Sequence, residues 1–177
     1  ENLAITSLGD VTSIGDYAFG ICLSLTDITI PSSVTTIGDG AFEACESLIS
    51  ITLPNTLTYI GNYMFFECYS LTSITIPNSV TTIGDYAFAE CSSLVSIIIP
   101  NSVTNIGKKA FRECSSLDTI ISLSMTPPAL GEDVFLECNN PTLFVPCEAL
   151  EAYQAHEQWG QFTDIQCIAS EEVETDD

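Results

Sequence analysis

The sequence repeats itself every 23 residues, and this period constrains the fold more than any other feature. Proline, cysteine and phenylalanine each recur at that step, and the last repeat is one residue longer. The columns are Pro31, Pro54, Pro77 and Pro100; Cys22, Cys45, Cys68, Cys91, Cys114 and Cys138; and Phe19, Phe42, Phe65, Phe88, Phe111 and Phe135. One such unit cannot bury its own Leu, Ile and Phe, but stacked units bury them in continuous columns. The sequence therefore predicts a solenoid.

One repeat, residues 77–99, shows the expected order of elements. Residues 94–99 are rich in β-branched side chains and end at Pro100, which predicts a strand that stops where the backbone donor is lost. Residues 80–83 predict a second, shorter extended piece. After a glycine turn, Asp85 can cap a helix, and the apolar residues that follow are spaced as on one helical face. We therefore expect one or two helical turns in each repeat.

The repeat pattern I-P-x-S-V-T-x-I-G-x-x-A-F-x-x-C-x-S-L-x-x-I-x-I resembles the BspA-like (Treponema-type) leucine-rich repeat family over residues 8–146. This resemblance implies an α/β solenoid, a right-handed leucine-rich repeat stack with a parallel β-sheet on its concave face and short helical turns on the convex side. It also implies a bacterial protein that is secreted or displayed on the cell surface of a host-associated species. Some members act in adhesion, a property that the repeat alone does not confer.

The period breaks toward the C-terminus, so the chain divides into three predicted parts. Residues 1–146 form the solenoid of about six coils, residues 147–168 a C-terminal helical cap, and residues 169–177 an acidic, flexible tail. Within the cap, residues 148–158 predict a helix. The apolar residues expected to close the end of the core are Ala149, Leu150, Tyr153, Trp159, Phe162 and Ile165.

The N-terminal edge shows no comparable cap. Ile5 aligns with Ile28, so the first residues are a partial repeat. Either more chain lies upstream, or a second copy covers this coil by end-to-end packing. The sequence starts without Met and without a signal-like segment, as expected of a processed or artificially chosen start at Glu1.

The charge of the chain excludes one class of partner. Its 177 residues include 24 Asp and Glu against 3 Lys and Arg, which gives a formal net charge of −21. Phosphate binding needs a basic surface, so we expect no nucleic acid partner. No apolar run approaches the ~20 residues that span a bilayer, so we expect no membrane span.

No motif for nucleophilic, zinc-dependent or phosphate-cradling catalysis occurs in the sequence, and His156 is the only histidine. We therefore expect a non-enzyme without cofactor or metal, with His156 as a solvated residue of the cap. The six repeat cysteines predict free buried thiols, because a core column takes the same residue from every coil. Cys147 and Cys167 both lie in the cap, and the sequence leaves open whether they form a disulfide.

The most extended candidate contact surface is a strip across the predicted strands. Between the core isoleucines, alternate residues point away from the core and form a line of hydroxyls that becomes apolar toward the C-terminus. The members of this strip are Asp27, Thr29, Ser50, Thr52, Ser73, Thr75, Ile98 and Ile121. Concave faces of solenoids commonly bind partners, which favours a contact here, whereas a face filled with β-forming residues needs no ligand.

The third repeat carries aromatic residues where most other repeats have small or polar ones. These residues are Tyr59, Tyr63, Phe66 and Tyr69. They mark either a contact with a protein or glycan, or packing between neighbouring coils.

Charged residues also fall into columns. A carboxylate precedes the cysteine in the later repeats, and we interpret this column as a solvated face rather than a calcium site. Its members are Glu67, Glu90, Glu113 and Glu137. The basic residues Lys108, Lys109 and Arg112 all lie in one repeat, where acidic residues of neighbouring coils are expected to pair with them.

Together these features predict an extracellular or cell-surface leucine-rich repeat protein that binds a host protein or glycan without catalysis. The alternative is a structural spacer that holds another domain away from the cell surface. The high negative charge fits both, because it keeps a repeat stack soluble. Replacing Thr52 and Thr75 with lysine distinguishes the two functions. The substitutions should abolish binding by the strip, whereas they should not affect a spacer.

Overall fold

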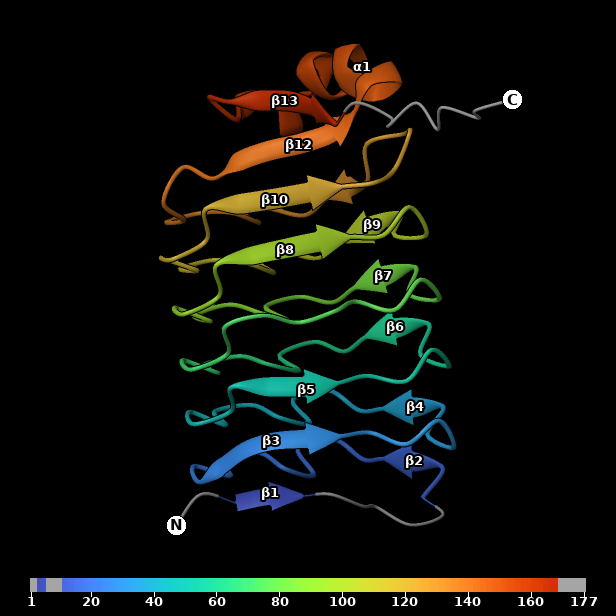
Figure 1. The fold of residues 1–177 in the computed structure, drawn as a ribbon, viewed down its shortest axis with the longest axis vertical. Coiled ribbons are helices and arrows are strands. Elements are labelled where there is room, and N and C mark those ends of the chain that lie inside the picture. Colours follow the sequence, from blue (N-terminus) through green and yellow to red (C-terminus); the bar gives the residue numbers. More distant parts are fainter. Residues whose placement is uncertain (1–2, 6–10, 169–177) are drawn as a thin grey trace, which may run out of the picture.

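The computed structural model describes residues 3–5 and 11–168, which form a stack of coils (Figure 1). A typical coil contains a longer strand, a loop that begins with proline, a two-residue strand and a turn segment that leads to the next coil. The longer strands are β1 (Leu3–Ile5), β3 (Leu25–Thr29), β5 (Ser50–Thr52), β8 (Ser96–Ile99), β10 (Thr119–Ser122), β12 (Thr142–Pro146) and β13 (Ile165–Ile168). The two-residue strands are β2 (Ser13–Ile14), β4 (Thr36–Ile37), β6 (Tyr59–Ile60), β7 (Thr82–Ile83), β9 (Asn105–Ile106) and β11 (Ala129–Leu130).

Every strand pair in the described residues is parallel, which confirms the stacked, parallel architecture predicted from the repeat. Ile5 pairs with Ile28, so the first partial repeat aligns as predicted. The longer strands form two sheets, β1-β3-β5 and β8-β10-β12-β13, and an isolated bridge pairs Thr75 of the intervening coil with Ile98 of β8. The predicted strand 94–99 is observed as β8, two residues shorter at its start.

The turn segments differ from their prediction. Residues 85–90 form consecutive turns instead of helical turns, and Tyr86 and Glu90 have positive φ angles of 55° and 61°. The next coil repeats this conformation at Lys109 and Glu113. Since a residue in the left-handed region ends a helix, two such residues in each segment prevent a helical turn from forming.

The backbone of each turn segment is hydrogen-bonded to the coil that follows it. In the fourth repeat, the N–H groups of Tyr86, Phe88 and Glu90 donate to carbonyls of the next coil at 2.7–2.9 Å. The corresponding N–H groups of the other coils donate in the same direction, from Tyr17 through Glu113. These bonds satisfy the backbone donors in place of an i to i−4 ladder, which explains why spacing on one helical face did not produce a helix.

The core consists of columns of identical side chains. The phenylalanine rings from Phe19 to Phe135 stack with centroids 5.1–5.7 Å apart. Beside them, each thiol from Cys45 to Cys138 donates to a phenylalanine carbonyl of the coil before it, as Cys68 does to Phe42 at 3.2 Å. The prediction of free, buried thiols is confirmed for the four inner coils, while the terminal members of the column are only half-buried. The buried thiols are Cys45, Cys68, Cys91 and Cys114, and the half-buried ones are Cys22 and Cys138.

The C-terminal segment contains three short helices and the last strand. The 3-10 helix η1 (Cys147–Ala149) leads into α1 (Leu150–Ala155), and η2 (Trp159–Gln161) precedes β13, which pairs with β12. The predicted helix 148–158 is therefore divided into shorter pieces. The predicted acidic tail, residues 169–177, lies outside the described residues.

Aromatic side chains of this segment pack on the last coil. Tyr153 and Trp159 are fully buried, and the ring of Trp159 lies 5.6 Å from that of Phe135. The Trp159 indole N–H donates to the carbonyl of Pro128 at 2.8 Å, and the Tyr153 hydroxyl is 2.7 Å from that of Ser122. Both buried polar groups are thus paired, which makes the burial of these large rings favourable.

Candidate functional site

Strand register sets most of the strip residues side by side in pairs, on both sides of the break between the two sheets. The pairs are Asp27 with Ser50, Thr29 with Thr52, Thr75 with Ile98, and Ile98 with Ile121. All of these side chains are exposed except that of Ile121, which is half-buried. Ser73 is exposed as well but lies in the coil that lacks a longer strand. The arrangement that the sequence predicts is therefore present as a surface, while its role as a contact stays a prediction.

The apolar end of the strip extends one residue beyond the residues predicted from the sequence. Ile121 pairs with Phe144 of β12, which is half-buried, and Ile98 leaves 49 % of its surface exposed. We refer to Ile98, Ile121 and Phe144 as the apolar patch. Phe144 could have been found because it follows Ile121 by one 23-residue step.

The aromatic residues of the third repeat do not form a single cluster. Tyr63 stacks on Tyr86 of the next coil with centroids 4.9 Å apart and meets Phe66 edge-on at 5.9 Å. Desolvation and the neighbouring tyrosines raise the pKa of Tyr63. Tyr86 in turn lies under the ammonium of Lys109, 5.9 Å from its ring centroid, and Tyr59 lies apart on β6. Packing between coils thus accounts for Tyr63, one of the two alternatives that the sequence left open.

Tyr69 lies near the column of carboxylates. It lines a hollow of about 340 Å3 together with Glu90, Glu113 and Glu137. Partial desolvation and repulsion by neighbouring glutamates raise the pKa of Glu90. Arg112 forms ion pairs with Glu113 and, at 3.8 Å, with Glu137, so the predicted pairing across coils is observed.

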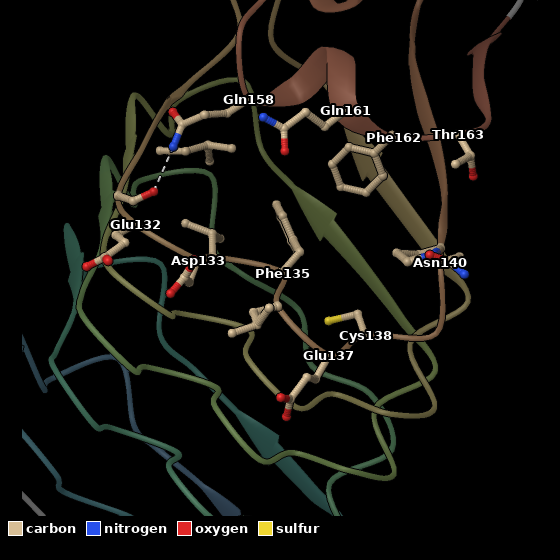
Figure 2. Close-up of a pocket in the computed structure, with 15 residues that line it drawn as sticks. Glu132, Asp133, Phe135, Glu137, Cys138, Asn140, Gln158, Gln161, Phe162 and Thr163 are labelled. Carbon is tan, nitrogen blue, oxygen red and sulfur yellow. Dashed lines mark hydrogen bonds between the residues drawn. The ribbon is translucent and has the colours of Figure 1, made fainter.

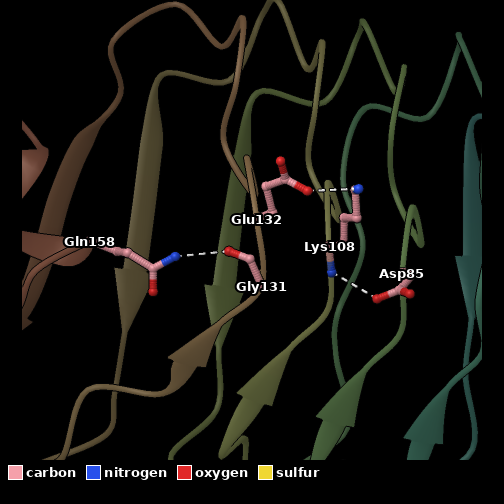
Figure 3. A network of polar contacts seen from close by, with 5 residues as sticks. All are labelled: Asp85, Lys108, Gly131, Glu132 and Gln158. Atoms are coloured by element: carbon pink, nitrogen blue, oxygen red, sulfur yellow. Dashed lines mark hydrogen bonds and ion pairs between the residues drawn. The ribbon is translucent and has the colours of Figure 1, made fainter.

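A second polar column lies at the first position of the turn segments, and we call it the ladder. Its members are Asp39, Asn62, Asp85 and Lys108. Asp39 accepts two bonds from Asn62, one from the backbone N–H at 2.8 Å and one from the side-chain amide at 3.1 Å. Asp85 accepts from the backbone N–H of Lys108 at 2.7 Å, and Lys108 Nζ pairs with Glu132 at 2.7 Å (Figure 3). The hydrogen-bonded ion pair raises the pKa of Lys108 and lowers that of Glu132. The expected pairing of Lys108 therefore occurs with Glu132, whereas Asp85 binds its backbone.

The two cysteines outside the repeat column lie next to each other. Cys147 of η1 and Cys167 of β13 are joined by a disulfide, with Cα atoms 4.5 Å apart. The segment between them contains α1 and η2. This link ties the start of the C-terminal segment to its last strand.

A hollow of about 530 Å3 lies between η2 and the last turn segment, residues 132–137 (Figure 2). The rings of Phe135 and Phe162, 5.3 Å apart, form part of its wall, and the amides of Gln158 and Gln161 lie at its η2 side. Gln158 donates to the carbonyl of Gly131 at 2.8 Å. The repeat pattern did not predict this hollow, because it forms only where the period breaks and one coil has no complete successor.

The histidine side chain, which lies outside these surfaces, has a structural role. His156 Nδ1 accepts from the backbone N–H groups of Gln158 and Trp159 at 3.2 and 3.3 Å, so the expectation of a merely solvated histidine is wrong. Among residues 3–5 and 11–168, no three His, Cys, Asp or Glu side chains are grouped so as to hold a metal ion.

The helices of the described part of the chain are all too short to cross a membrane.

Comparison with known families and structures agrees with this architecture. The BspA type leucine rich repeat region matches residues 12–142 in six copies. A leucine-rich repeat protein from Bacteroides ovatus is 35 % identical with a TM-score of 0.75, over 82 % of this chain and 40 % of that one. The leucine-rich repeat protein of T. pallidum is 32 % identical with a TM-score of 0.70, over 78 % of this chain and 77 % of that one.

A third similar structure is a leucine rich cell surface protein from Faecalibacterium prausnitzii, 39 % identical with a TM-score of 0.67. The match covers 69 % of this chain but only 32 % of that protein, so the chain spans about a third of its length. Among curated proteins, none matches the chain. Because the family pattern extends over most of the sequence and the stacked parallel coils carry its spacing, the chain belongs to the BspA-type leucine-rich repeat family.

Proposed function

We propose that this chain is a non-catalytic binding module of a secreted or cell-surface bacterial protein, and that its strip contacts a host protein or glycan. Membership of the BspA-type family supports this location, as does the similarity to a leucine rich cell surface protein. The related proteins that match are leucine-rich repeat proteins, which supports a binding role over a catalytic one.

The apolar patch is the observation that carries the proposal. Ile98 is half exposed at a position where the threonines of earlier coils, Thr29 and Thr52, face solvent. Strand register sets Ile98 beside Ile121, and Ile121 beside Phe144. A sheet face that remains in water normally carries polar side chains, so a contiguous apolar line favours a covered surface.

The rest of the strip has the composition of an interface rim. Hydroxyls of Thr52 and Thr75 occupy the same strand position as the apolar patch, with Asp27 in the neighbouring line, and can exchange water for polar groups of a partner. An apolar centre with a polar margin is the usual anatomy of a protein–protein contact, which favours a protein over a glycan. The strong negative charge of the chain disfavours acidic partners.

A binding panel tests this proposal. Matrix glycoproteins and host glycans would be presented to the purified chain at physiological salt, with and without calcium. We expect saturable binding to a protein, abolished by Ile98→Glu and by the pair Thr52→Lys and Thr75→Lys. Thr36→Lys with Thr58→Lys provides the control, because both threonines are exposed on a different side of the coil.

The rival function is the structural spacer. It predicts no saturable binding at high protein concentration, and equal behaviour of the strip and control variants. Circular dichroism of each variant separates loss of binding from loss of fold. A hit on a glycan instead of a protein, lost in the strip variants, would retain the surface but change the class of partner.

A further inference from the structure

The hollow at the C-terminal end contains a row of backbone donors without acceptors. In the inner coils, three alternate N–H groups of each turn segment donate to the following coil, as those of Lys109, Phe111 and Glu113 do at 2.9 Å. The corresponding groups of the last turn segment belong to Asp133, Phe135 and Glu137. No described residue accepts a hydrogen bond from any of these three N–H groups. We refer to them as the donor row.

The C-terminal segment covers the core of the last coil but leaves the donor row open. β13 continues the sheet beside β12, and Trp159 and Phe162 pack on the ring of Phe135. At the turn segment, however, the next layer is replaced by the hollow of about 530 Å3. A whole additional coil cannot enter this position, because β13 and Trp159 already occupy the rest of its plane. Only a short segment fits.

The hollow has the chemistry of a site for a peptide backbone. In the inner coils, each donor row is matched by carbonyls on alternate residues, for example those of Glu132, Val134 and Leu136. The amide nitrogens of Gln158 and Gln161 already donate to the carbonyls of Gly131 and Glu157, so each amide offers its oxygen and its second N–H for main-chain hydrogen bonds. The ring of Phe162 adds an apolar wall. Backbone pairing supplies affinity in peptide recognition, and the surrounding side chains supply selectivity.

Charge selects the kind of peptide. Asp133 and Glu137 line the hollow with exposed carboxylates. Glu132, also at its rim, is paired with Lys108 at 2.7 Å, and Glu137 has a longer ion pair with Arg112 at 3.8 Å. Asp133 is therefore the carboxylate of the three that has no cation within ion-pair distance in the described part of the chain. No lysine or arginine is among the lining residues. The chain that follows Ile168 is itself acidic, so it is a poor occupant of an acidic hollow.

We propose that the hollow binds a short peptide segment that contains a lysine or arginine, whose carbonyls accept from the donor row while its cationic side chain lies at Asp133 and Glu137. The site is separate from the strip, so it stands or falls independently of the proposed function. It adds a second contact, at the end of the stack, to any contact made by the strands.

Two-dimensional NMR with amide hydrogen exchange tests the proposal on the full chain. The probe is the peptide acetyl-Gly-Thr-Lys-Thr-Gly-amide, and its counterpart with Glu in place of Lys is the matched control. In the free protein, we expect rapid exchange at Asp133, Phe135 and Glu137, in contrast to Phe111. Saturating Lys peptide should slow exchange of the donor row about tenfold, as new hydrogen bonds form.

Two protein variants test the roles of charge and space. Asp133→Asn with Glu137→Gln keeps both side-chain shapes and should weaken the Lys peptide about fivefold, removing its advantage over the Glu peptide. Glu67→Gln is the control, since it makes the same change in an inner coil where the N–H is already paired. Thr163→Trp, at the mouth of the hollow, should block both peptides.

Two results would overturn the proposal. One is the absence of protection at the donor row at millimolar Lys peptide, with shifts confined to other surfaces. The other is protection that is equal for the Lys and Glu peptides and unchanged by the double variant, because the acidic rim would then have no part in selection.

Discussion

The ring of Tyr17 occupies the space that any side chain at Gly40 would need. A Cβ added to Gly40 would lie 2.2 Å from Cε1 of that ring, far inside contact distance. Gly40 has a φ of 60°, but Tyr63 and Tyr86 adopt similar angles at the equivalent positions of later coils. The glycine is therefore required by the tyrosine of the preceding coil more than by its own backbone.

This relationship predicts a specific coupling. Gly40→Ala should lower the free energy of unfolding by about 2–3 kcal/mol, since it must displace the ring and also place a Cβ at a positive φ. In a Tyr17→Ala background the same change should cost only about 1 kcal/mol. Urea unfolding of the four proteins measures the difference. Additive effects of the two substitutions would show that the ring is free to move aside.

The ladder predicts a second stability effect. Asp39→Ala leaves the half-buried backbone N–H of Asn62 without its acceptor and should cost about 1–2 kcal/mol. Asp39→Asn keeps an oxygen at that position and should cost less than about 1 kcal/mol. Thermal unfolding compares the two variants, and exchange of the Asn62 amide should accelerate only in the alanine variant. Equal costs would mean that charge, and not the hydrogen bond, stabilises this part of the ladder.

The cysteines predict a count of reactive groups. Alkylation in denaturant should label six thiols without reductant and all eight cysteines after reduction, as intact mass will show. Eight labels without reductant would exclude the bridge between Cys147 and Cys167.

In the folded protein, the inner thiols should be nearly inert at pH 8. Burial raises the pKa of Cys45 to about 11 and that of Cys68 well above its usual value. The thiolate is the reactive form, so alkylation of Cys45 should be slow at pH 8, accelerate steadily as the pH rises, and level off only above a pH of about 11. Rapid labelling of Cys68 at pH 8 in the native protein would contradict the burial of this column.

The carboxylate column predicts a pH dependence with a defined sign. Desolvation and neighbouring glutamates raise the pKa of Glu90 in the folded state. In the pH window between the ordinary glutamate pKa and this raised pKa, the folded protein therefore binds more protons than the unfolded chain does. This group therefore lowers stability as the pH rises through that window, and its destabilising contribution is constant above it. Glu90→Gln should raise the melting temperature at pH 7 by about 1–2 °C. The difference should vanish below the ordinary glutamate pKa, and a decrease at pH 7 would indicate that attraction to Arg112 dominates.

The repeat pattern predicted the stack because burial columns need one residue type in every coil. Phe42 and Cys68 could be placed in the core from spacing alone. The same spacing that correctly predicted the stack also led to the wrong prediction of a helical turn after Asp85. The residues that lie on one helical face also line one core column, and only the left-handed angles at Tyr86 and Glu90 distinguish the two conformations.

The candidate surfaces were predictable to different degrees. The strip follows from strand alternation, so the amino-acid sequence alone places Thr52 and Ile98 on the outward face of the strands. The stacking of Tyr63 on Tyr86 depends on ring orientation across coils, which spacing cannot supply. The hollow beside Phe135 depends on how the C-terminal segment departs from the repeat, and no periodic signal describes a departure.

The single direction of the turn-segment hydrogen bonds restricts how this protein can assemble. Because every inner N–H of the column points toward the C-terminal end, that end presents donors at Asp133, Phe135 and Glu137 and offers no matching acceptors in the same row. A two-fold dimer through this end would oppose donors with donors. Two-fold symmetry requires a self-complementary surface, which this row is not, so a copy of the protein bound there must contribute a different surface. Where that contact repeats head to tail, it either closes into a ring or continues as an open array.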